Sequence, residues 1–276
     1  MLHTVIKTLV ADDSAVAREV VKSGIRFYQN KRVFDVETAA DGDTAMRVLY
    51  RNQVDLAFID INMPRLSGTQ VIAAMKETRS RGCLTVAMST GMNEKAASVL
   101  SEFGTYHFLK KPFRPEDVAC IVKAYLAMTE RHAILIVDDS PIMRKLARRT
   151  LECSRFKFDI TEVDNAEAAL RAIASNRFKL VLTDFHMPGI DGLELAGAIR
   201  ELSSKIAVYM MSTNDTTYLE RSAAFVGISG FLQKPFAPED IDTLMHNLLG
   251  LECPEFAKSR DAFRFLERER KATEDR

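Results

Sequence analysis

Short apolar runs alternate with amphipathic segments along most of the chain. The apolar runs carry few polar interruptions, which is typical of strands in a sheet that is covered on both faces. In the second half, the predicted strands are 133–137, 158–163, 180–184, 207–211 and 230–233. Helix-spaced apolar residues lie between them and predict helices at about 141–154, 166–176, 191–202, 216–225 and 238–249. This alternation predicts a doubly wound parallel sheet of the α/β class, with its site at the carboxyl ends of the strands.

The first half follows the same plan, with predicted strands near 5–10, 34–39, 54–59, 84–88 and 106–109. Three motifs also recur in the same order in the two halves. They are "ADDS" at 11–14 and "VDDS" at 137–140, "FIDINMP" at 58–64 and "LTDFHMP" at 182–188, and "FLKKPFRPED" at 108–117 and "FLQKPFAPED" at 231–240. Motifs that keep their order over such a length indicate a tandem duplication.

The duplication predicts two domains, a linker and a tail. The domains are 1–128 and 133–250, the linker is 129–132, and the tail is 251–276. Because the linker is so short, we expect the two domains to touch rather than to swing freely.

Carboxylates follow the predicted strands of the first half at the points where these strands end. Asp12 and Asp13 follow the first strand, and Asp60 ends the third. Since the carboxyl ends of parallel strands meet in one crevice, we expect these side chains to lie together. Three carboxylates repel one another unless a hard divalent cation joins them, and Mg²⁺ favours a few carboxylates plus waters. The second half repeats the set as Asp138, Asp139 and Asp184.

A lysine and a hydroxyl complete each set. Lys111 follows the fifth predicted strand and Ser89 the fourth. A carboxylate nucleophile, a metal, an ammonium and a hydroxyl suit phosphoryl transfer, because the metal and the lysine neutralise the equatorial oxygens during in-line attack. Thr90 and Thr213 each follow the serine, so the register is open, and we prefer the serine because it directly abuts the apolar strand. The corresponding residues of the second half are Lys234 and Ser212.

Together these motifs resemble those of two response-regulator receiver domains in tandem. The family pattern is an acidic pair after strand 1, a phospho-accepting Asp followed by "xxMP" after strand 3, Ser or Thr after strand 4, and Lys-Pro after strand 5. Both halves match this pattern throughout. The resemblance implies two flavodoxin-like (βα)5 domains, and we expect a short helical C-terminal tail.

The resemblance also implies a role for each residue. Asp60 and Asp184 would accept phosphoryl groups from a histidine kinase or a histidine phosphotransfer protein. The metal would be Mg²⁺ or alternatively Mn²⁺, and these two residues would bind it together with Asp13 and Asp139. Asp12 and Asp138 would hold the waters of the metal. The backbone carbonyls of Asn62 and His186 would be further ligands. Lys111 and Lys234 would pair with the phosphoryl group, Ser89 and Ser212 would hydrogen-bond it, and Phe108 and Phe231 would be the aromatic residues that swing inward.

Composition narrows the class of protein. Lys plus Arg and Asp plus Glu balance at 38 each, so no global field attracts nucleic acid or an anionic membrane. A strand-like segment close to Met1 leaves no room for a signal peptide, and no apolar run approaches the roughly 20 residues that span a bilayer. Scattered cysteines indicate a reducing compartment, so we expect a cytoplasmic protein. They are Cys83, Cys120, Cys153 and Cys253.

Other functions remain open beside that of a phosphorylated switch acting through protein contacts. One half can be an adaptor or dimerisation module that is not phosphorylated, or the protein can act as a phosphate sink; a homodimer is also open. A flavodoxin-like cofactor binder is disfavoured, since acids stand where a phosphate-cradling loop is needed. No kinase, cyclase or helix-turn-helix motif is visible, so we expect no enzyme activity beyond assisted phosphorylation and dephosphorylation of the domains themselves.

His186 and the tail carry two further expectations. His186 can ligate metal or exchange phosphate, but we favour a residue that shapes the edge of the pocket. In the tail, Pro254 suits a helix start, and Phe256, Phe263 and Leu266 form a narrow apolar stripe among alternating charges. We favour a solvated, charged helix there over one that docks on a partner.

Overall fold

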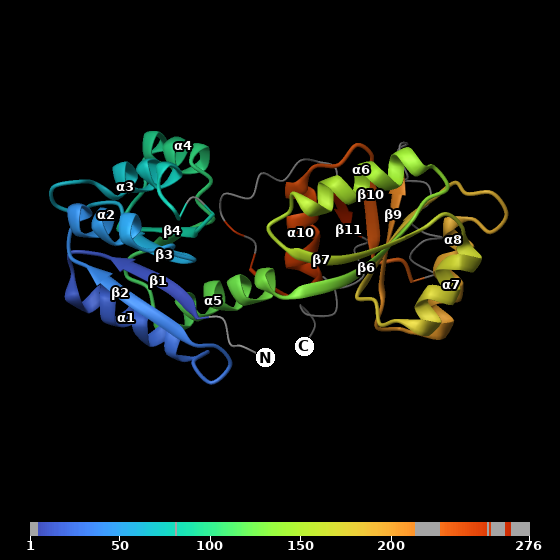
Figure 1. The fold of residues 1–276 in the computed structure, drawn as a ribbon, viewed down its shortest axis with the longest axis horizontal. Helices are drawn as coiled ribbons and strands as arrows, with labels where there is room; N and C mark the ends of the chain where they lie inside the picture. Colours follow the sequence, from blue (N-terminus) through green and yellow to red (C-terminus); the bar gives the residue numbers. More distant parts are fainter. Residues whose placement is uncertain (1–4, 81, 213–226, 253, 255–262, 266–276) are drawn as a thin grey trace, which may run out of the picture. The chain divides into compact units, whose positions relative to one another are not determined.

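The computed structural model places the described part of the chain in two compact units. The first unit lies within 1–126 and 251–257, and the second within 127–250 and 258–276. The structure describes residues 5–80, 82–212, 227–252, 254 and 263–265. Each unit is a sheet flanked by helices (Figure 1).

The first unit is built on five parallel strands in the order β2-β1-β3-β4-β5. The strands are β1 (Ile6–Ala11), β2 (Phe34–Ala39), β3 (Leu56–Asp60), β4 (Leu84–Ser89) and β5 (His107–Lys110). The helices are α1 (Ala15–Arg26), α2 (Gly42–Arg51), α3 (Gly68–Ala74), α4 (Glu94–Glu102) and α5 (Pro115–Thr129), with a 3₁₀ turn η1 (Met75–Glu77) after α3. Helices α2, α3 and α4 cover one face of the sheet and α1 the other (Figure 1).

Burial explains why these segments form this sheet. All residues of the inner strands β3 and β4 are buried, whereas the edge strand β2 is mostly half-buried or exposed. One core cluster joins Leu9, Ile59, Val71, Leu100 and Phe108 from five different elements. Apolar side chains on both faces of a central strand need helices on both sides, which confirms the predicted doubly wound architecture.

Side-chain caps begin helices α1 to α4 of the first unit. Ser14, Asp41 and Asn93 each accept a hydrogen bond from the backbone N–H three residues on. Ser67 does the same and forms a capping box with Gln70 at the start of α3. Such caps each stabilise a helix end by about 1 kcal/mol, and here they define where the chain turns from strand end to helix.

The second unit repeats the parallel sheet and adds a strand at one edge. Its order is β11-β10-β9-β8-β6-β7, with β11 antiparallel to β10 and the other pairs parallel. The strands are β6 (Arg131–Val137), β7 (Lys157–Val163), β8 (Leu180–Asp184), β9 (Ala207–Ser212), β10 (Gly230–Gln233) and β11 (Phe263–Phe265). The helices are α6 (Pro141–Glu152), α7 (Ala166–Ser175), α8 (Gly192–Leu202) and α10 (Pro238–Leu248). The predicted helix at 216–225 lies outside the described residues.

The tail differs from its predicted helix at three residues. Phe263–Phe265 form β11, whose backbone pairs with Gly230, Phe231 and Leu232 of β10. The helical prediction is therefore wrong for this segment. An edge strand presents a row of unpaired N–H and C=O groups, and an extended segment can satisfy them where a helix cannot. Of the remaining tail, only residues 251, 252 and 254 are described.

The predicted linker, residues 129–132, overlaps the end of α5 and the start of β6. Helix α5 runs to Thr129 and β6 begins at Arg131, so Glu130 alone separates the two elements. In the part of the chain described here, no helix combines the length and the apolar character needed to span a membrane.

Candidate functional site

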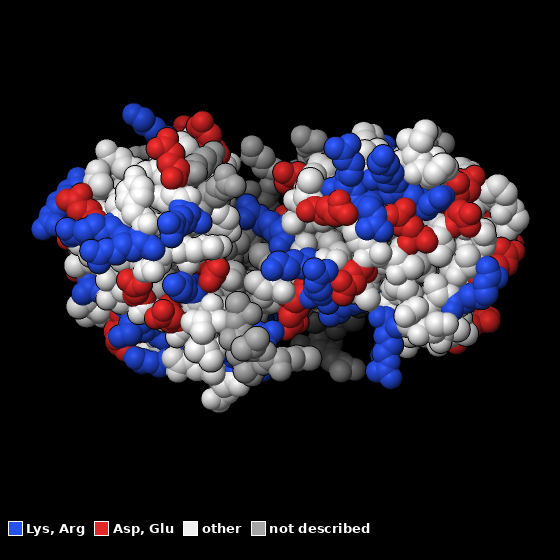
Figure 2. Space-filling model, in the orientation of Figure 1, with Lys and Arg blue, Asp and Glu red and all other residues white. Residues whose placement is uncertain are grey.

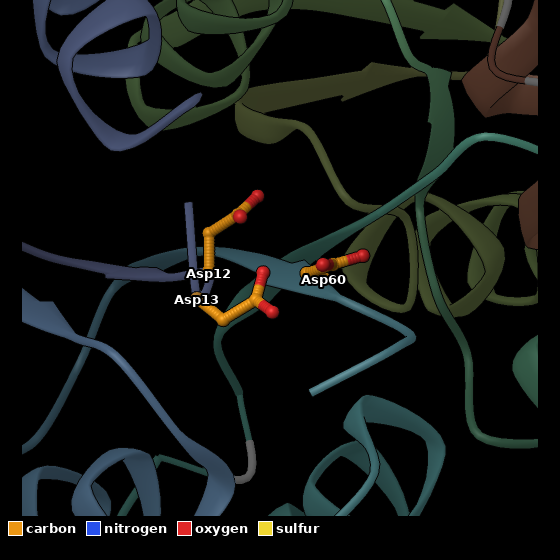
Figure 3. A group of neighbouring side chains, drawn as sticks. All are labelled: Asp12, Asp13 and Asp60. Carbon is orange, nitrogen blue, oxygen red and sulfur yellow. The ribbon is translucent and has the colours of Figure 1, made fainter. Parts of the chain in front are cut away.

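Three carboxylates meet where β1 and β3 end in the first unit. Asp12 and Asp13 follow β1, and Asp60 is the last residue of β3, which is the direct neighbour of β1 in the sheet. One carboxylate oxygen from each lies within 4.8 Å of the others, and Figure 3 shows the three side chains gathered at this edge. Asp12 and Asp60 are buried while Asp13 is exposed, so the cluster opens to solvent at Asp13.

Lys111 faces the two buried carboxylates. Its Nζ lies 2.7 Å from Oδ2 of Asp12 and 2.9 Å from Oδ2 of Asp60. The chain brings it there because β5 ends one residue before it and its backbone N–H donates to the carbonyl of Ser89, at 2.7 Å. One ammonium among three ionised carboxylates leaves two negative charges in excess, which suits a divalent cation.

Burial changes the proton affinity of this cluster. Desolvation raises the pKa of Asp60, and the neighbouring charge of Asp12 adds to the effect, although Lys111 opposes it. For Lys111, burial works against the charged form, but hydrogen bonds to Asp12 and Asp60 outweigh it and raise its pKa. The lysine therefore stays charged, and Asp60 takes up a proton at a higher pH than a free aspartate does.

Asp60→Asn is expected to stabilise the metal-free first unit by an amount that grows with pH. An unfolded Asp60 ionises near its ordinary pKa of 3.8, whereas the folded carboxyl ionises at higher pH. As pH rises through this window, the free energy of unfolding of the wild-type unit falls relative to that of the Asn variant, and the difference levels off above the folded pKa.

Urea unfolding of the full chain in EDTA, at pH values from about 4 to 8, measures this difference. The methyl NMR signals of Ile25 and Ile59 report the first unit because both residues lie in its core. A gap between wild type and variant that stays constant across the pH range would contradict the assigned pKa direction.

Ser89, and not Thr90, contacts the loop that follows Asp60. Ser89 ends β4, is buried, and its Oγ accepts a hydrogen bond from Nδ2 of Asn62 at 3.1 Å. Thr90 is exposed. Asn62 also donates its backbone N–H to Oδ1 of Asp60, at 3.3 Å. The serine, the amide and the carboxylate thus form one connected group beside Lys111.

The second unit reproduces the charged cluster. Asp138, Asp139 and Asp184 each place a carboxylate oxygen within 4.8 Å of the others. Nζ of Lys234 lies 2.7 Å from Oδ2 of Asp138 and 2.9 Å from Oδ1 of Asp184. The backbone N–H of Lys234 donates to the carbonyl of Ser212, which is buried at the end of β9. Thr213 lies outside the described residues.

The two pockets differ around the acceptor carboxylate. The side chain of Asp184 is 18% exposed and that of Asp60 5%. His186 stands where the first unit has Asn62; it is exposed, and its ring packs edge-on against Phe185 with ring centroids 4.6 Å apart. Its role at the edge of the pocket stays a prediction.

Phe108 and Phe231 lie in the core of their units. Phe108 is 8% and Phe231 4% exposed, and each belongs to the cluster that packs one face of its sheet. Both lie on the strand that leads to the site lysine. Their inward movement stays a prediction.

Two glycines that the sequence analysis did not single out shape the site. Gly68 begins α3 and Gly192 begins α8. A Cβ on Gly68 would lie 2.0 Å from the carbonyl oxygen of Asp60, and one on Gly192 would lie 2.2 Å from that of Asp184. Both glycines follow the "MP" motif at the same spacing, and this recurrence was the available signal.

The donor chemistry of both clusters fits Mg²⁺. Each cluster consists of carboxylate oxygens from two adjacent strand ends, with no thiolate or imidazole among the ligand atoms. Hard cations prefer such oxygens, and Mg²⁺ retains waters when the protein supplies only some of its ligands. Asp13, Asp60, Asp139 and Asp184 would hold the ion, and the exposed side of each cluster leaves room for water.

Comparison with known proteins agrees with this geometry. The sequence pattern of the response regulator receiver domain matches residues 8–123 and again 134–246. "Response regulator MprA" of Mycobacterium sp. (strain KMS) is 31% identical over 134 residues, which are 49% of this chain and 57% of that relative. The chain thus spans little more than half the length of the curated relatives it matches.

Two solved structures share the fold over most of the chain. Both are described as two-component system response regulator/GGDEF domain proteins. One, at 24% identity and a TM-score of 0.56, covers 89% of this chain and 99% of its own. The other, at 23% identity and a TM-score of 0.57, covers 89% and 98%. With two pattern matches that together exceed half its length, this chain belongs to the response regulator receiver domain family.

Proposed function

We propose that the protein is a two-component signalling switch in which both units accept a phosphoryl group, on Asp60 and on Asp184. The observation that carries this proposal is the repetition of one complete set of groups. In each unit three carboxylates lie within 4.8 Å, and a lysine ammonium contacts the acceptor aspartate. A unit kept only as an adaptor has no need of a cluster whose charges repel one another.

The reaction is an in-line displacement at phosphorus. A carboxylate oxygen of Asp60 or Asp184 attacks the phosphorus of a phosphohistidine; the new O–P bond forms as the N–P bond breaks. The electron pair returns to the imidazole, which takes a proton from solvent, and the product is an acyl phosphate. A bound Mg²⁺ would supply neutralisation of the phosphoryl oxygens.

The chain's own residues hold the acceptor ready for this step. Lys111 contacts Oδ2 of Asp60 and fixes the orientation of the carboxylate. As phosphoryl charge arrives, the same ammonium lies within reach of it. The Oγ of Ser89, which accepts a hydrogen bond from Asn62, would bind a phosphoryl oxygen after transfer. Lys234 and Ser212 would act in the same way on Asp184.

We propose a protein phosphodonor, a histidine kinase or a histidine phosphotransfer protein. An apolar side chain is exposed three residues after each acidic pair: Val16 is 74% and Ile142 76% exposed. In the second unit a small pocket reaches the site lysine; it is lined by Met143, Leu146, Ala147, Thr150, Met211, Lys234, Pro235 and Phe236. Exposed apolar residues beside a charged site suit the surface of another protein.

Output through protein contacts, in the cytoplasm, completes the proposal. Acidic and basic side chains are interspersed on the face shown in Figure 2, so this face offers no single-sign surface for nucleic acid. Cys83, Cys120 and Cys153 are free thiols, which suits a reducing compartment.

Mass spectrometry after incubation with acetyl phosphate and Mg²⁺ tests the function. We expect one phosphoryl addition on Asp60 and one on Asp184, both removed by hydroxylamine because acyl phosphates are labile. Asp60→Asn and Asp184→Asn should each lose one addition, and the double variant both. Labelling of a single aspartate would favour the adaptor role for the other unit. Phosphate on Ser89 or Ser212 would overturn the mechanism.

A further inference from the structure

An arginine on the first helix of each unit donates hydrogen bonds to the backbone carbonyls of the acidic pair. In the first unit, Nη1 of Arg18 donates to the carbonyl oxygens of Asp12, at 2.5 Å, and Asp13, at 3.2 Å. In the second, Nη1 of Arg144 donates to those of Asp138, at 2.7 Å, and Asp139, at 3.2 Å.

These bonds close a small self-contained turn between β1 and α1. Oδ1 of Asp12 accepts the backbone N–H of Ser14 at 2.9 Å, and Oγ of Ser14 accepts that of Ala17 at 3.3 Å as the cap of α1. Arg18 then reaches back from the helix to the start of the turn. The turn at Asp138 shows the same two bonds: Ser140 N–H to Oδ1 of Asp138 at 2.9 Å, and Met143 N–H to Oγ of Ser140 at 3.4 Å.

The choice of carbonyl partners has a consequence for the site. An arginine beside three carboxylates usually binds them as a bidentate pair, which would occupy the oxygens a metal needs. Here Arg18 donates to backbone carbonyls, so it does not occupy the carboxylate oxygens of Asp13 and Asp60. Asp13 is exposed, and Arg18 contacts it at its backbone carbonyl.

We propose that Arg18 and Arg144 are positioning residues that pre-organise the acidic turn and so set the Mg²⁺ affinity of each unit. This inference rests on the proposed function, because it takes the acidic clusters to be Mg²⁺ sites. Groups that orient metal ligands without touching the metal commonly contribute 10–100-fold to affinity. Charge acts in the opposite direction: removing a cation beside a cation site would by itself tighten binding.

The test measures Mg²⁺ binding by calorimetry in the full chain carrying Asp139→Ala, so that only the first unit binds the ion. We expect Arg18→Met to raise the Kd for Mg²⁺ about tenfold. Arg18→Lys, which retains one nitrogen donor and the charge, should recover part of the loss. Arg26→Met is the matched control, since Arg26 lies on the same helix and pairs with Glu19, and its Kd should equal that of the parent.

A second readout needs no metal. In EDTA, Arg18→Met should speed hydrogen exchange at the N–H of Ser14, whose bond to Asp12 depends on the turn. An unchanged or lower Kd in a folded Arg18→Met protein, together with unchanged exchange at Ser14, overturns the proposal. If the parent itself binds no Mg²⁺, the proposed function fails instead, and exchange at Ser14 still decides whether Arg18 holds the turn. Should Arg18→Met not fold, Arg18→Lys is compared with the parent instead, both in its Kd for Mg²⁺ and in hydrogen exchange at Ser14.

Discussion

Asp13→Ala is expected to abolish Mg²⁺ binding by the first unit and to leave that of the second unit intact. Asp13 is the exposed member of its cluster, and Lys111 contacts the other two carboxylates, those of Asp12 and Asp60. Without Asp13, two carboxylates share one ammonium, so little charge is left to attract a divalent cation. Because loss of a group that only supports ligands costs 10–100-fold, loss of a ligand should weaken binding by more than about 100-fold.

Calorimetry on the full chain checks this result. Wild type should bind two Mg²⁺, Asp13→Ala and Asp139→Ala one each, and the double variant none. Asp35→Ala is the control. Asp35 lies in β2 opposite Lys7 of β1, whereas the site lies at the other end of β1, beyond Ala11, so this change removes a carboxylate of the first unit far from the site. It should bind as wild type does. Two ions on the double variant would show that the metal lies elsewhere.

Gly68→Ala is expected to destabilise the first unit and to damage its site at the same time. A Cβ at this position would meet the carbonyl oxygen of Asp60 at 2.0 Å, far inside van der Waals contact. The obstacle is backbone and cannot rotate away, so either α3 or the end of β3 must shift. Overpacking of this kind costs about 1–3 kcal/mol, and the shift should also move the carboxylate of Asp60 relative to Lys111.

Urea unfolding, followed by the methyl NMR signals of Ile59, measures the stability of this unit, and calorimetry measures its Mg²⁺ affinity. Gly192→Ala should have the same effect on the second unit, where the clash with the carbonyl of Asp184 is at 2.2 Å. Gly82→Ala is the control, because a Cβ there meets nothing within 4 Å. Equal stability of Gly68→Ala and Gly82→Ala would contradict the close approach.

The sequence by itself determined the class of fold and the membership of the site. Continuous apolar runs specify strands that need cover on both faces, and acids that end such strands must meet at one edge of a parallel sheet. Asp12, Asp60 and Lys111 could therefore be placed together without coordinates, since strand direction and the end of each strand are local properties. Because the motifs are duplicated, the same prediction holds for the second half of the chain.

The tertiary structure decided what depends on distances between strands and helices. Whether Ser89 or Thr90 contacts Asn62 follows from the pairing of β3 with β4, which places the two strand ends side by side. The need for glycine at position 68 arises only where α3 meets the end of β3. Phe263–Phe265 extend because β10 has an edge to pair, and no periodicity in the tail encodes that edge. Arg18 looks like any basic residue of a surface helix until the angle between β1 and α1 brings it back onto the carbonyls of Asp12 and Asp13.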